Sequence, residues 1–449
     1  MAGSAITNGQ SAMNTWTIEG GQPLRGEVTV SGAKNSITKL LVASLLSAEP
    51  SLFRNVPDIG DREITQEMCE AVGAKVNLQS AHSLLVHSPE LTSDEISAEL
   101  GGRNRLAIMM MGPLLHRLGR AVIPAAAGGD KIGPRPVNFH LEGVKRMGAE
   151  VRDEDGVYVI EGGDLHGAEI ELPYPSVTTT ENLLMTATMV KGRTTLHNAA
   201  IEPEVMDLVN YLQKMGAIID YKVDRTFVVE GVEELHGAEH RLIADRIVAA
   251  SLGAAAVASN GDVFVRNAKQ RDMLTFLNTL RRVGGAFEVS DDGIRFFRSG
   301  PLNAIHLETS VHPGFMTDWQ PPFLLLLTQA EGMSVVHETV FEDRFGYVSA
   351  LTEMGAEIAL YDSCLGNRCR FTSSTYKHSA VVKGPTQLKG AEFEVPDLRA
   401  GFTYLIAAIV AEGKSTIHGI EHITRGYEHL EDSLQNLGVN IQKVEPAKA

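Results

Sequence analysis

The chain has 449 residues, of which 43% are hydrophobic and 21% are charged. This composition is typical of a globular protein of about two or three domains. The net charge of −16 argues against nucleic acid as the main partner, because a phosphate backbone binds to a basic surface. A site for small anions would need arginine and lysine to be concentrated locally.

The cysteines and the hydropathy pattern indicate where the protein works. The chain has three cysteines, Cys69, Cys364 and Cys369. This number is odd and too small for a disulfide framework, which favours a reducing cytoplasm. Residues 1–14 show no signal peptide. The longest apolar run, Phe323 to Leu327, is too short to cross a membrane. We therefore expect a cytoplasmic protein that does not interact with membranes.

In chain order, apolar stretches that lack a polar face predict a series of buried helices. They are Leu40 to Leu46, Leu183 to Val190, Ile247 to Val257, Phe323 to Gln329 and Leu405 to Val410. Each is followed by a turn of small residues and a β-rich stretch.

A second helix in each unit is predicted to end at a glycine and to lead into a strand. These endings recur at a spacing of roughly 70–80 residues, at Val72–Val76, Met147–Val151, Met215–Ile218, Val283–Phe287, Met354–Ile358 and Leu437–Ile441. The glycine is expected to adopt a left-handed conformation that caps the helix. Six such units predict an α/β protein of two domains, each with three repeats, with helices inside and sheets outside.

Two segments place charge beside glycine in the first half of the chain. Lys34, in Ser31–Ser36, is predicted to lie at the start of a buried helix, where an anion is favoured. A lysine on the surface is the alternative. Asp130, Lys131 and Arg135 lie in a stretch of small residues and glycines that predicts a mobile loop, which could supply a proton and anion contacts. A solvated turn explains that loop equally well.

Two further segments lie in the second half. Asp318 precedes a buried helix, where it could be a helix cap or a general base. Arg344, Arg399 and Arg425 occupy comparable places near helix starts, and guanidinium groups bind carboxylates and phosphates. Surface salt bridges are the ordinary alternative for each of them.

Several other chemistries find no support in the sequence. We see no Walker A sequence, no Gly-x-Ser-x-Gly and no Cys or His cluster with metal-ligand spacing. We interpret His140 and His312 as core or hydrogen-bonding histidines rather than as ligands.

At these residues the sequence resembles the enolpyruvyl transferase family, from about Gly20 to Val444. The motifs that carry the resemblance are Gly32–Asn35, Gly133–Val137, Ala199–Glu204, Asp245–Arg246, Thr317–Asp318, Asp397–Ala400 and Arg425–Glu428. The resemblance implies two inside-out α/β-barrel domains of βαβαββ-like repeats that close over a central cleft. It also implies that the domains comprise residues 34–240, which would carry the lid, and residues 1–33 with 241–449, completed by the N-terminal strand.

The resemblance further implies transfer of the carboxyvinyl group of phosphoenolpyruvate to a hydroxyl of a uridine nucleotide, without a metal, an organic cofactor or a protein partner. Asp318 would withdraw the hydroxyl proton, and Asp130 would protonate the vinyl methylene on a closing lid. The residues that would bind phosphoenolpyruvate are Lys34, Asn35, Arg135, Arg399 and Arg425, with Lys34 also catalytic. Those on the nucleotide side are Asn35, Arg105, Pro136, Val137, Asn138, Phe139, Ser176, Val177, Asp318, Phe341 and Arg344.

Some residues depart from the family pattern. Many members carry cysteine at the position of Asp130, and that cysteine is the target of the epoxide fosfomycin. A carboxylate is a poorer nucleophile, so we predict resistance to this antibiotic. Thr178–Thr179, Asn138 and Met109 also depart, and they leave the acceptor open between UDP-N-acetylglucosamine, in peptidoglycan precursor synthesis, and UMP, in nucleoside-antibiotic assembly. Transfer to shikimate 3-phosphate fits poorly, and a non-catalytic nucleotide-binding paralogue is a further alternative.

Overall fold

The computed structural model describes residues 15–126, 128 and 136–444. They form two compact units, each with its own hydrophobic core. The N-terminal unit consists of residues 31–126, 128 and 136–244, and the C-terminal unit of residues 15–30 and 245–444. These boundaries fall a few residues away from 34 and 241, the positions expected from the sequence. Within the described ranges, no helix has the length and apolar character needed to cross a bilayer.

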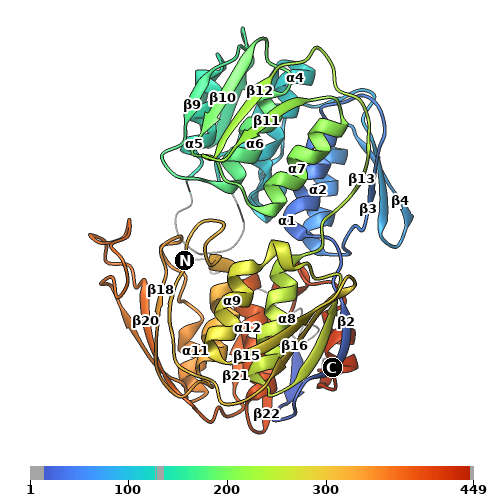
Figure 1. Ribbon diagram of the computed structural model, residues 1–449. Coiled ribbons are helices and arrows are strands. Elements are labelled where there is room, and N and C mark those ends of the chain that lie inside the picture. The colour runs from blue at the N-terminus through green and yellow to red at the C-terminus, as the bar shows by residue number, and fades with distance from the viewer. Residues whose placement is uncertain (1–14, 127, 129–135, 445–449) are drawn as a thin grey trace, which may run out of the picture. The chain divides into compact units, whose positions relative to one another are not determined.

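The N-terminal unit contains three sheets around a group of helices (Figure 1). The first sheet has the order β13 (Glu239–Arg241), β3 (Ser51–Arg54), β5 (Ser83–His87) and β4 (Lys75–Ser80). The second has the order β11 (Ile218–Lys222), β12 (Thr226–Glu230), β10 (Arg193–His197) and β9 (Glu169–Glu171). The third has the order β6 (Arg120–Pro124), β8 (Val157–Glu161) and β7 (Glu150–Glu154). The helices are α1 (Lys34–Ser44), α2 (Gly60–Ala71), α3 (Ala98–Arg103), η1 (Leu106–Met110), α4 (Met111–Leu118), α5 (Asn138–Arg146), α6 (Val177–Ala187) and α7 (Pro203–Lys214).

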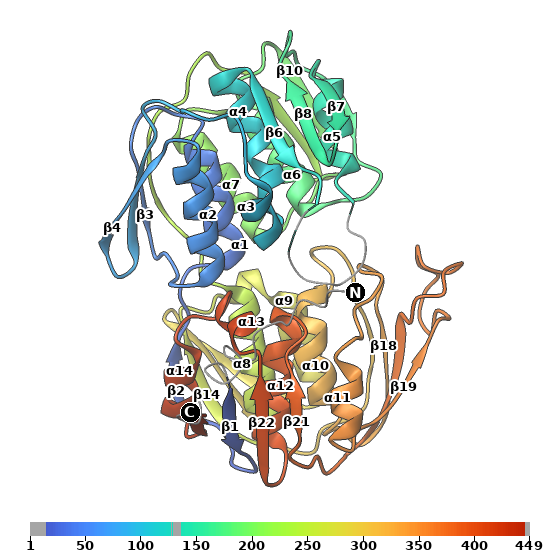
Figure 2. The ribbon, with the colours of Figure 1, turned by 180° about the vertical axis from the view of Figure 1, so that it is seen from behind.

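The C-terminal unit repeats this plan (Figure 2). Its first sheet has the order β15 (Gly285–Val289), β16 (Gly293–Arg298), β14 (Asp262–Arg266) and β2 (Arg25–Thr29). The second has the order β17 (His306–Glu308), β18 (Gly332–His337), β20 (Ser379–Gly384) and β19 (Glu357–Tyr361). The third has the order β21 (Glu392–Glu394), β22 (Lys414–His418), β1 (Trp16–Glu19) and β23 (Asn440–Lys443). The helices are α8 (Arg246–Ala258), η2 (Gln270–Asp272), α9 (Leu274–Val283), η3 (Thr317–Trp319), α10 (Gln320–Leu327), α11 (Val348–Glu353), α12 (Leu398–Val410), α13 (Glu421–Thr424) and α14 (Leu430–Asn436).

The repeat is visible in the chain order of the elements. A complete βαβαββ sequence occurs as β9–α6–β10–α7–β11–β12 and again as β17–α10–β18–α11–β19–β20. Three strands cross between the halves of the sequence, and the first of them, β1, pairs with β22 and β23 of the C-terminal unit. β2 precedes α1 but pairs in parallel with β14 of the C-terminal unit, whereas β13 precedes α8 but pairs in parallel with β3 of the N-terminal unit.

Helices α10 and α12 of the C-terminal unit are buried because they are largely apolar around their whole circumference. Every residue of α10 is buried, as are all but one of α12. The strands alternate instead, as in β22, where inward-facing residues are buried and their neighbours are partly exposed. A sheet with one apolar face must cover a core, which places the sheets outside the helices.

The expected glycine caps are present in all six units. Gly73, Gly148, Gly216, Gly284, Gly355 and Gly438 follow the second helix of their units, and each has a positive φ between 93° and 111°. Only glycine adopts this backbone without steric strain.

Candidate active site

In the N-terminal unit, Lys34 is the first residue of α1, as its place in the sequence predicted. Its Nζ lies 2.8 Å from Oδ2 of Asp61, a buried residue in the first turn of α2. The first-turn N–H groups of a helix have no intrahelical acceptors, and together with the helix dipole they favour an anion. Lys34 therefore adds a fixed positive charge to a helix end that already suits an anion, and half-buried Asn35 follows it.

The starts of α5 and α6 form a second polar group in the same unit. Ser176 caps α6, where its Oγ accepts the amide of Thr179 at 3.4 Å and the hydroxyl of Thr179 at 2.9 Å. Pro136 and Asn138, at the start of α5, are exposed, whereas Val137 and Phe139 are half-buried.

His140 joins these helix starts to the segment that carries Arg105. Its Nε2 lies 3.4 Å from Oγ1 of Thr178, and its Nδ1 lies 3.0 Å from Nδ2 of Asn182, which also donates to the carbonyl of Ile108 at 3.0 Å. Burial lowers the pKa of His140 to about 3, and the positive charge of Arg105 lowers it as well. The imidazole is therefore neutral, so the interpretation of His140 as a hydrogen-bonding core residue agrees with the structure.

In the C-terminal unit, Asp318 lies in η3 and is held by two buried arginines. Its Oδ1 accepts a hydrogen bond from Nη2 of Arg344 at 2.9 Å, and its Oδ2 lies 3.5 Å from Nε of Arg399. Two guanidinium groups thus fix the position and orientation of this carboxylate. Because 19% of the side chain of Asp318 remains exposed, the carboxylate is still accessible from outside the unit.

Arg399 is itself fixed from several directions. It lies in the first turn of α12, whose cap Asp397 accepts the amides of Arg399 and Ala400. Its Nη1 donates to the hydroxyl of Tyr427 at 3.3 Å. Burial by itself lowers the pKa of Arg399, but Tyr427, Asp318 and Asp245 raise it above its ordinary value. The guanidinium is therefore a permanent, preorganised charge.

Glu338 organises the loop that leads to Arg344. It is completely buried, and its Oε1 accepts the amides of Val340 and Phe341 at 2.8 and 3.1 Å. Its Oε2 accepts the hydroxyl of Thr317 at 3.0 Å. Burial raises the pKa of Glu338, although the amides of Val340 and Phe341 and the charge of Arg344 act in the opposite direction. One carboxyl group thus connects the residue before Asp318 to the segment that carries Phe341 and Arg344.

The residues singled out from the sequence divide between the two units. Lys34, Asn35, Arg105, Pro136, Val137, Asn138, Phe139, Ser176 and Val177 belong to the N-terminal unit, and Asp318, Phe341, Arg344, Arg399 and Arg425 to the C-terminal unit. Within the latter, Asp318, Arg344 and Arg399 are in direct contact, while half-buried Arg425 directly follows α13. Asp130, Lys131 and Arg135 lie outside the described residues.

Some residues of the site carry no signal in the sequence. Asp61 pairs with Lys34 and Glu338 with Thr317, and both partners are distant in sequence. Tyr427 does stand in the Arg425–Glu428 motif, but nothing in the sequence indicates its contact with Arg399. Asp61 lies in the charged run Asp61–Glu63, a pattern that indicates no more than the start of a helix. Met109, suspected of influencing the acceptor, is completely buried and belongs to the core.

The fold and this distribution of charges define an α/β transferase of two repeated units. A model of the EPSP synthase (3-phosphoshikimate 1-carboxyvinyltransferase) family matches residues 18–434, and the chain belongs to this family of enolpyruvyl transferases. The family and the α/β fold predicted from the sequence are thereby confirmed.

Known relatives match nearly the whole chain. The chain is 49% identical to the UDP-N-acetylglucosamine 1-carboxyvinyltransferase of Protochlamydia amoebophila, over 97% of this chain and 96% of that protein. It is 38% identical to UDP-N-acetylglucosamine 1-carboxyvinyltransferase 1 of Staphylococcus aureus, over 96% of this chain and 100% of that protein.

Solved structures share the fold. The enolpyruvyl transferase NikO from Streptomyces tendae has a TM-score of 0.84 at 25% identity, and the match covers 96% of this chain and 99% of NikO. EPSP synthase from Acinetobacter baumannii has a TM-score of 0.70 at 17% identity, covering 95% of this chain and 99% of that chain, which shows the fold alone.

Proposed function

We propose that this protein transfers the enolpyruvyl group of phosphoenolpyruvate to a hydroxyl of UDP-N-acetylglucosamine and releases phosphate, as a cytoplasmic step in peptidoglycan precursor synthesis. The observation that carries the reaction is the carboxylate of Asp318, held by Arg344 and Arg399. The acceptor is supported by relatives named for this activity, which are up to 49% identical over nearly the full length.

The chain supplies groups for each part of the reaction. Asp318 withdraws the proton from the acceptor hydroxyl, which makes the oxygen a nucleophile toward the vinyl carbon. Lys34, Asn35, Arg135, Arg399 and Arg425 bind the phosphate and carboxylate of phosphoenolpyruvate, which carry about three negative charges. Asp130 protonates the methylene carbon. Loss of phosphate from the resulting tetrahedral ketal then restores the double bond.

The nucleotide side is assigned to the polar group at the starts of α5 and α6. Ser176, Val177 and Arg105 would contact the diphosphate, since helix N-termini and a guanidinium group both favour anions. The segment Pro136–Phe139 would contact the uracil, and its exposed residues are available for that contact. Phe341 and Arg344 would complete this side.

UMP is the second candidate acceptor, and Asn138 and the pair Thr178–Thr179 are the observations that keep it open. β-branched residues restrict the approach of a diphosphate to the backbone. In this structure Thr179 is buried and its hydroxyl bonds to the cap Ser176, while the hydroxyl of Thr178 lies beside His140. Both threonines therefore have local partners within the unit, which weakens the argument against UDP-N-acetylglucosamine.

The decisive experiment is to measure phosphate release from phosphoenolpyruvate with UDP-N-acetylglucosamine and with UMP in parallel. We expect release with UDP-N-acetylglucosamine at least about tenfold faster than with UMP, a difference in transition-state stabilisation of about 1.4 kcal/mol. Release with UMP alone would move the protein to nucleoside metabolism. The absence of release with either acceptor would refute both and favour a nucleotide-binding paralogue.

The variant Asp318→Asn tests the assignment of the base. It keeps the shape and one hydrogen-bond acceptor for Arg344 but cannot take up a proton, so we expect kcat to fall by about 10²- to 10⁴-fold. Nucleotide affinity, measured by calorimetry, should change little. Asp291→Asn, an exposed carboxylate in the turn between β15 and β16, is the matched control and should retain full activity. Turnover by Asp318→Asn at the normal rate would contradict the assignment.

A further inference from the structure

The connection between β19 and β20 is unlike the equivalent connections in the other repeats. The antiparallel pairs β4–β5, β7–β8, β11–β12 and β15–β16 are joined by residues 81–82, 155–156, 223–225 and 290–292. β19 and β20 are joined by residues 362–378, in which the structure shows no helix or strand. Irregular loops longer than about 12–15 residues are uncommon in compact domains and usually have a function or a special means of stabilisation.

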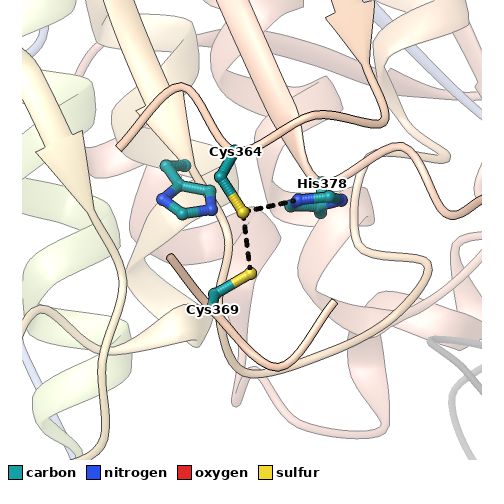
Figure 3. A group of neighbouring side chains, drawn as sticks. Cys364, Cys369 and His378 are labelled. Carbon is teal, nitrogen blue, oxygen red and sulfur yellow. Dashed lines mark hydrogen bonds between the residues drawn. The ribbon is translucent and has the colours of Figure 1, made fainter. Parts of the chain in front are cut away.

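Four potential metal ligands meet at the base of this loop, which we call the β19–β20 loop. They are His337 at the end of β18, Cys364 and Cys369 in the loop, and His378 just before β20. The candidate ligand atoms all lie within 4.8 Å of one another. Figure 3 shows the sulfur of Cys364 next to both the sulfur of Cys369, at 3.5 Å, and Nε2 of His378, at 3.4 Å. The expectation of no such cluster was therefore wrong.

Both imidazoles are oriented as metal-binding histidines are. Nδ1 of His337 lies 3.0 Å from Oε2 of Glu308, and Nδ1 of His378 lies 2.9 Å from the carbonyl oxygen of Tyr376. Because these partners accept hydrogen bonds, each Nδ1 carries the proton and each Nε2 presents its lone pair to the cluster. Metal-ligating histidines are characteristically held in this way, by a carboxylate or carbonyl on the other ring nitrogen.

One atom of the cluster is buried without a hydrogen-bond partner among the residues that the structure describes. This atom is Nε2 of His337. It is inaccessible to solvent and makes no hydrogen bond with any described residue, and the side chain of His337 is only 1% exposed. A buried nitrogen that lacks a partner costs free energy. An ion bound by Nε2 would remove that cost.

The separations around Cys364 suit a metal ion rather than a disulfide. Zinc–sulfur bonds of about 2.3 Å and zinc–nitrogen bonds of about 2.0–2.1 Å at tetrahedral angles place neighbouring ligand atoms about 3.3–3.8 Å apart. The separations of 3.5 and 3.4 Å around Cys364 fall in that range. A disulfide requires about 2.05 Å between the sulfurs, and both cysteines are free.

We propose that Nε2 of His337, Sγ of Cys364, Sγ of Cys369 and Nε2 of His378 bind a structural zinc ion. Two thiolates and two imidazoles are a zinc donor set, and four protein ligands leave no open position for a substrate. The ion is therefore distinct from the proposed reaction, which needs no metal. Binding releases the two thiol protons to solvent, because cysteine binds zinc as the thiolate.

The zinc ion would order the β19–β20 loop, which contributes few side chains to the hydrophobic core. Within residues 362–378 only Phe371 and His378 are buried. The amide of Phe371 donates to Sγ of Cys369 at 3.4 Å, as expected of a group supporting a thiolate ligand. Gly366 passes so close to Glu308 and His337 that a Cβ atom there would lie 2.4 and 2.5 Å from their side chains. The loop therefore fits closely over the cluster.

The ordered loop would in turn hold the segment before Arg344. Arg370 donates through Nη2 to the carbonyl of Val340 and, at 3.1 Å, to Oε1 of Glu342. The same segment begins next to the cluster, since His337 immediately precedes Glu338 in the chain. Loss of the ion would release residues 362–378 first.

The first test is the metal content of the full-length protein, purified without chelator from zinc-supplemented cells and measured by mass spectrometry of the elements. We expect one zinc per chain, and less than about a tenth of that in Cys364→Ser and His378→Gln, since removing one of four ligands opens the site. Cys69→Ala and His306→Ala, which change the same residue types elsewhere, should keep the full content. A zinc-free wild-type protein, or equal zinc in all the variants, would overturn the proposal.

A second measurement uses the wild-type protein, so it does not depend on the folding of a variant. Cobalt added to the chelator-treated protein should give the strong visible absorption of a tetrahedral cobalt–thiolate centre, and zinc should abolish it. Chelation should also speed tryptic cleavage after Arg368 by about tenfold or more, because the loop opens. An intact Cys364–Cys369 disulfide in the purified protein would refute the site. So would a cleavage rate that does not change on chelation, together with a visible absorption that does not change on addition of cobalt or zinc.

Discussion

At the scale of single residues, His140 makes the stability of the N-terminal unit depend on pH. Its pKa is lowered to about 3 by burial and by Arg105, whereas an unfolded histidine has a pKa of about 6.5. Between these values the unfolded chain binds a proton that the folded chain does not. The contribution of His140 to stability is therefore fully present above pH 6.5 and is lost as the pH falls toward 3. The loss is at most about 1.4 kcal/mol for each pH unit.

The variant His140→Gln should remove this contribution. We expect its free energy of unfolding in urea, measured from pH 7 to pH 4, to fall less steeply than that of the wild type, whatever its absolute value. His306→Gln replaces an exposed histidine and should leave the slope unchanged. Parallel slopes for His140→Gln and the wild type would show that another group causes the acid sensitivity.

Residues of the site could be found in the sequence where their chemistry is local. Lys34, Asp318 and Arg399 stand at helix starts beside glycines or other charges, and those helix starts are present. Asp61 could not be found, and neither could the contact between Tyr427 and Arg399, because each depends on a distant segment. His337 was missed for the same reason, since pairing of β18 with β20 brings it beside Ser379 and the loop cysteines.

At the scale of elements, the existence of helices could be predicted better than their ends. The stretch expected at Leu183–Val190 overlaps α6, which begins at Val177 and ends at Ala187. A helix buried on all sides has no amphipathic period to mark its bounds. α4 was not predicted, because Gly112 and Pro113 interrupt the apolar pattern of a short helix.

The glycine caps allow a prediction about backbone strain alone. Gly438 has a φ of +93°, and an added Cβ would meet no atom within 4 Å, so Gly438→Ala introduces strain without a clash. We expect a loss of about 1–2 kcal/mol in the free energy of unfolding. Gly148→Ala should cost more, because its Cβ would also lie 2.5 Å from the carbonyl oxygen of Asp164.

A matched control is available at Gly102, which lies within α3 and also has open space around its Cβ position but no positive φ. Gly102→Ala should stabilise the protein by about 0.5–1 kcal/mol, since alanine restricts the unfolded chain and favours helix. Thermal unfolding of the three variants tests the order. A stabilised Gly438→Ala would contradict the assigned conformation.

Fosfomycin offers a prediction for a residue outside the described ranges. If Asp130 stands where many family members carry the reactive cysteine, the wild type should keep its activity in the presence of the epoxide. Asp130→Cys should instead lose activity with time, because a thiolate opens the epoxide more readily than a carboxylate does. Mass spectrometry would locate the adduct. Rapid labelling of Asp130 in the wild type would contradict the prediction.

At the scale of the whole molecule, the repeat was the strongest signal in the sequence. Two groups of three sheets, each around its own buried helices, follow from six copies of one pattern. The exchange of β2 and β13 does not follow from that pattern, because parallel pairing between distant strands leaves no local trace. Only the family resemblance implied such an exchange, and it did so by placing residues 1–33, which include β2, with the C-terminal domain.

The separate cores make the two units distinguishable by spectroscopy. The chain has two tryptophans, Trp16 and Trp319, and both are buried in the core of the C-terminal unit. Tryptophan fluorescence therefore reports on that unit, whereas far-ultraviolet circular dichroism reports on both. Leu41 of α1 and Leu326 of α10 are completely buried in the N-terminal and C-terminal cores, respectively. Truncation of either to alanine should cost about 2–5 kcal/mol.

We expect Leu41→Ala to shift the circular dichroism transition in urea to lower concentration while the fluorescence transition stays in place. Leu326→Ala should shift the fluorescence transition, because the lost methyl groups belong to the core that holds both tryptophans. Domains with their own cores unfold as separate cooperative units unless a large interface couples them. Equal shifts of both signals in both variants would therefore show that the two cores unfold as one, and the repeats would have to be treated as a single cooperative structure.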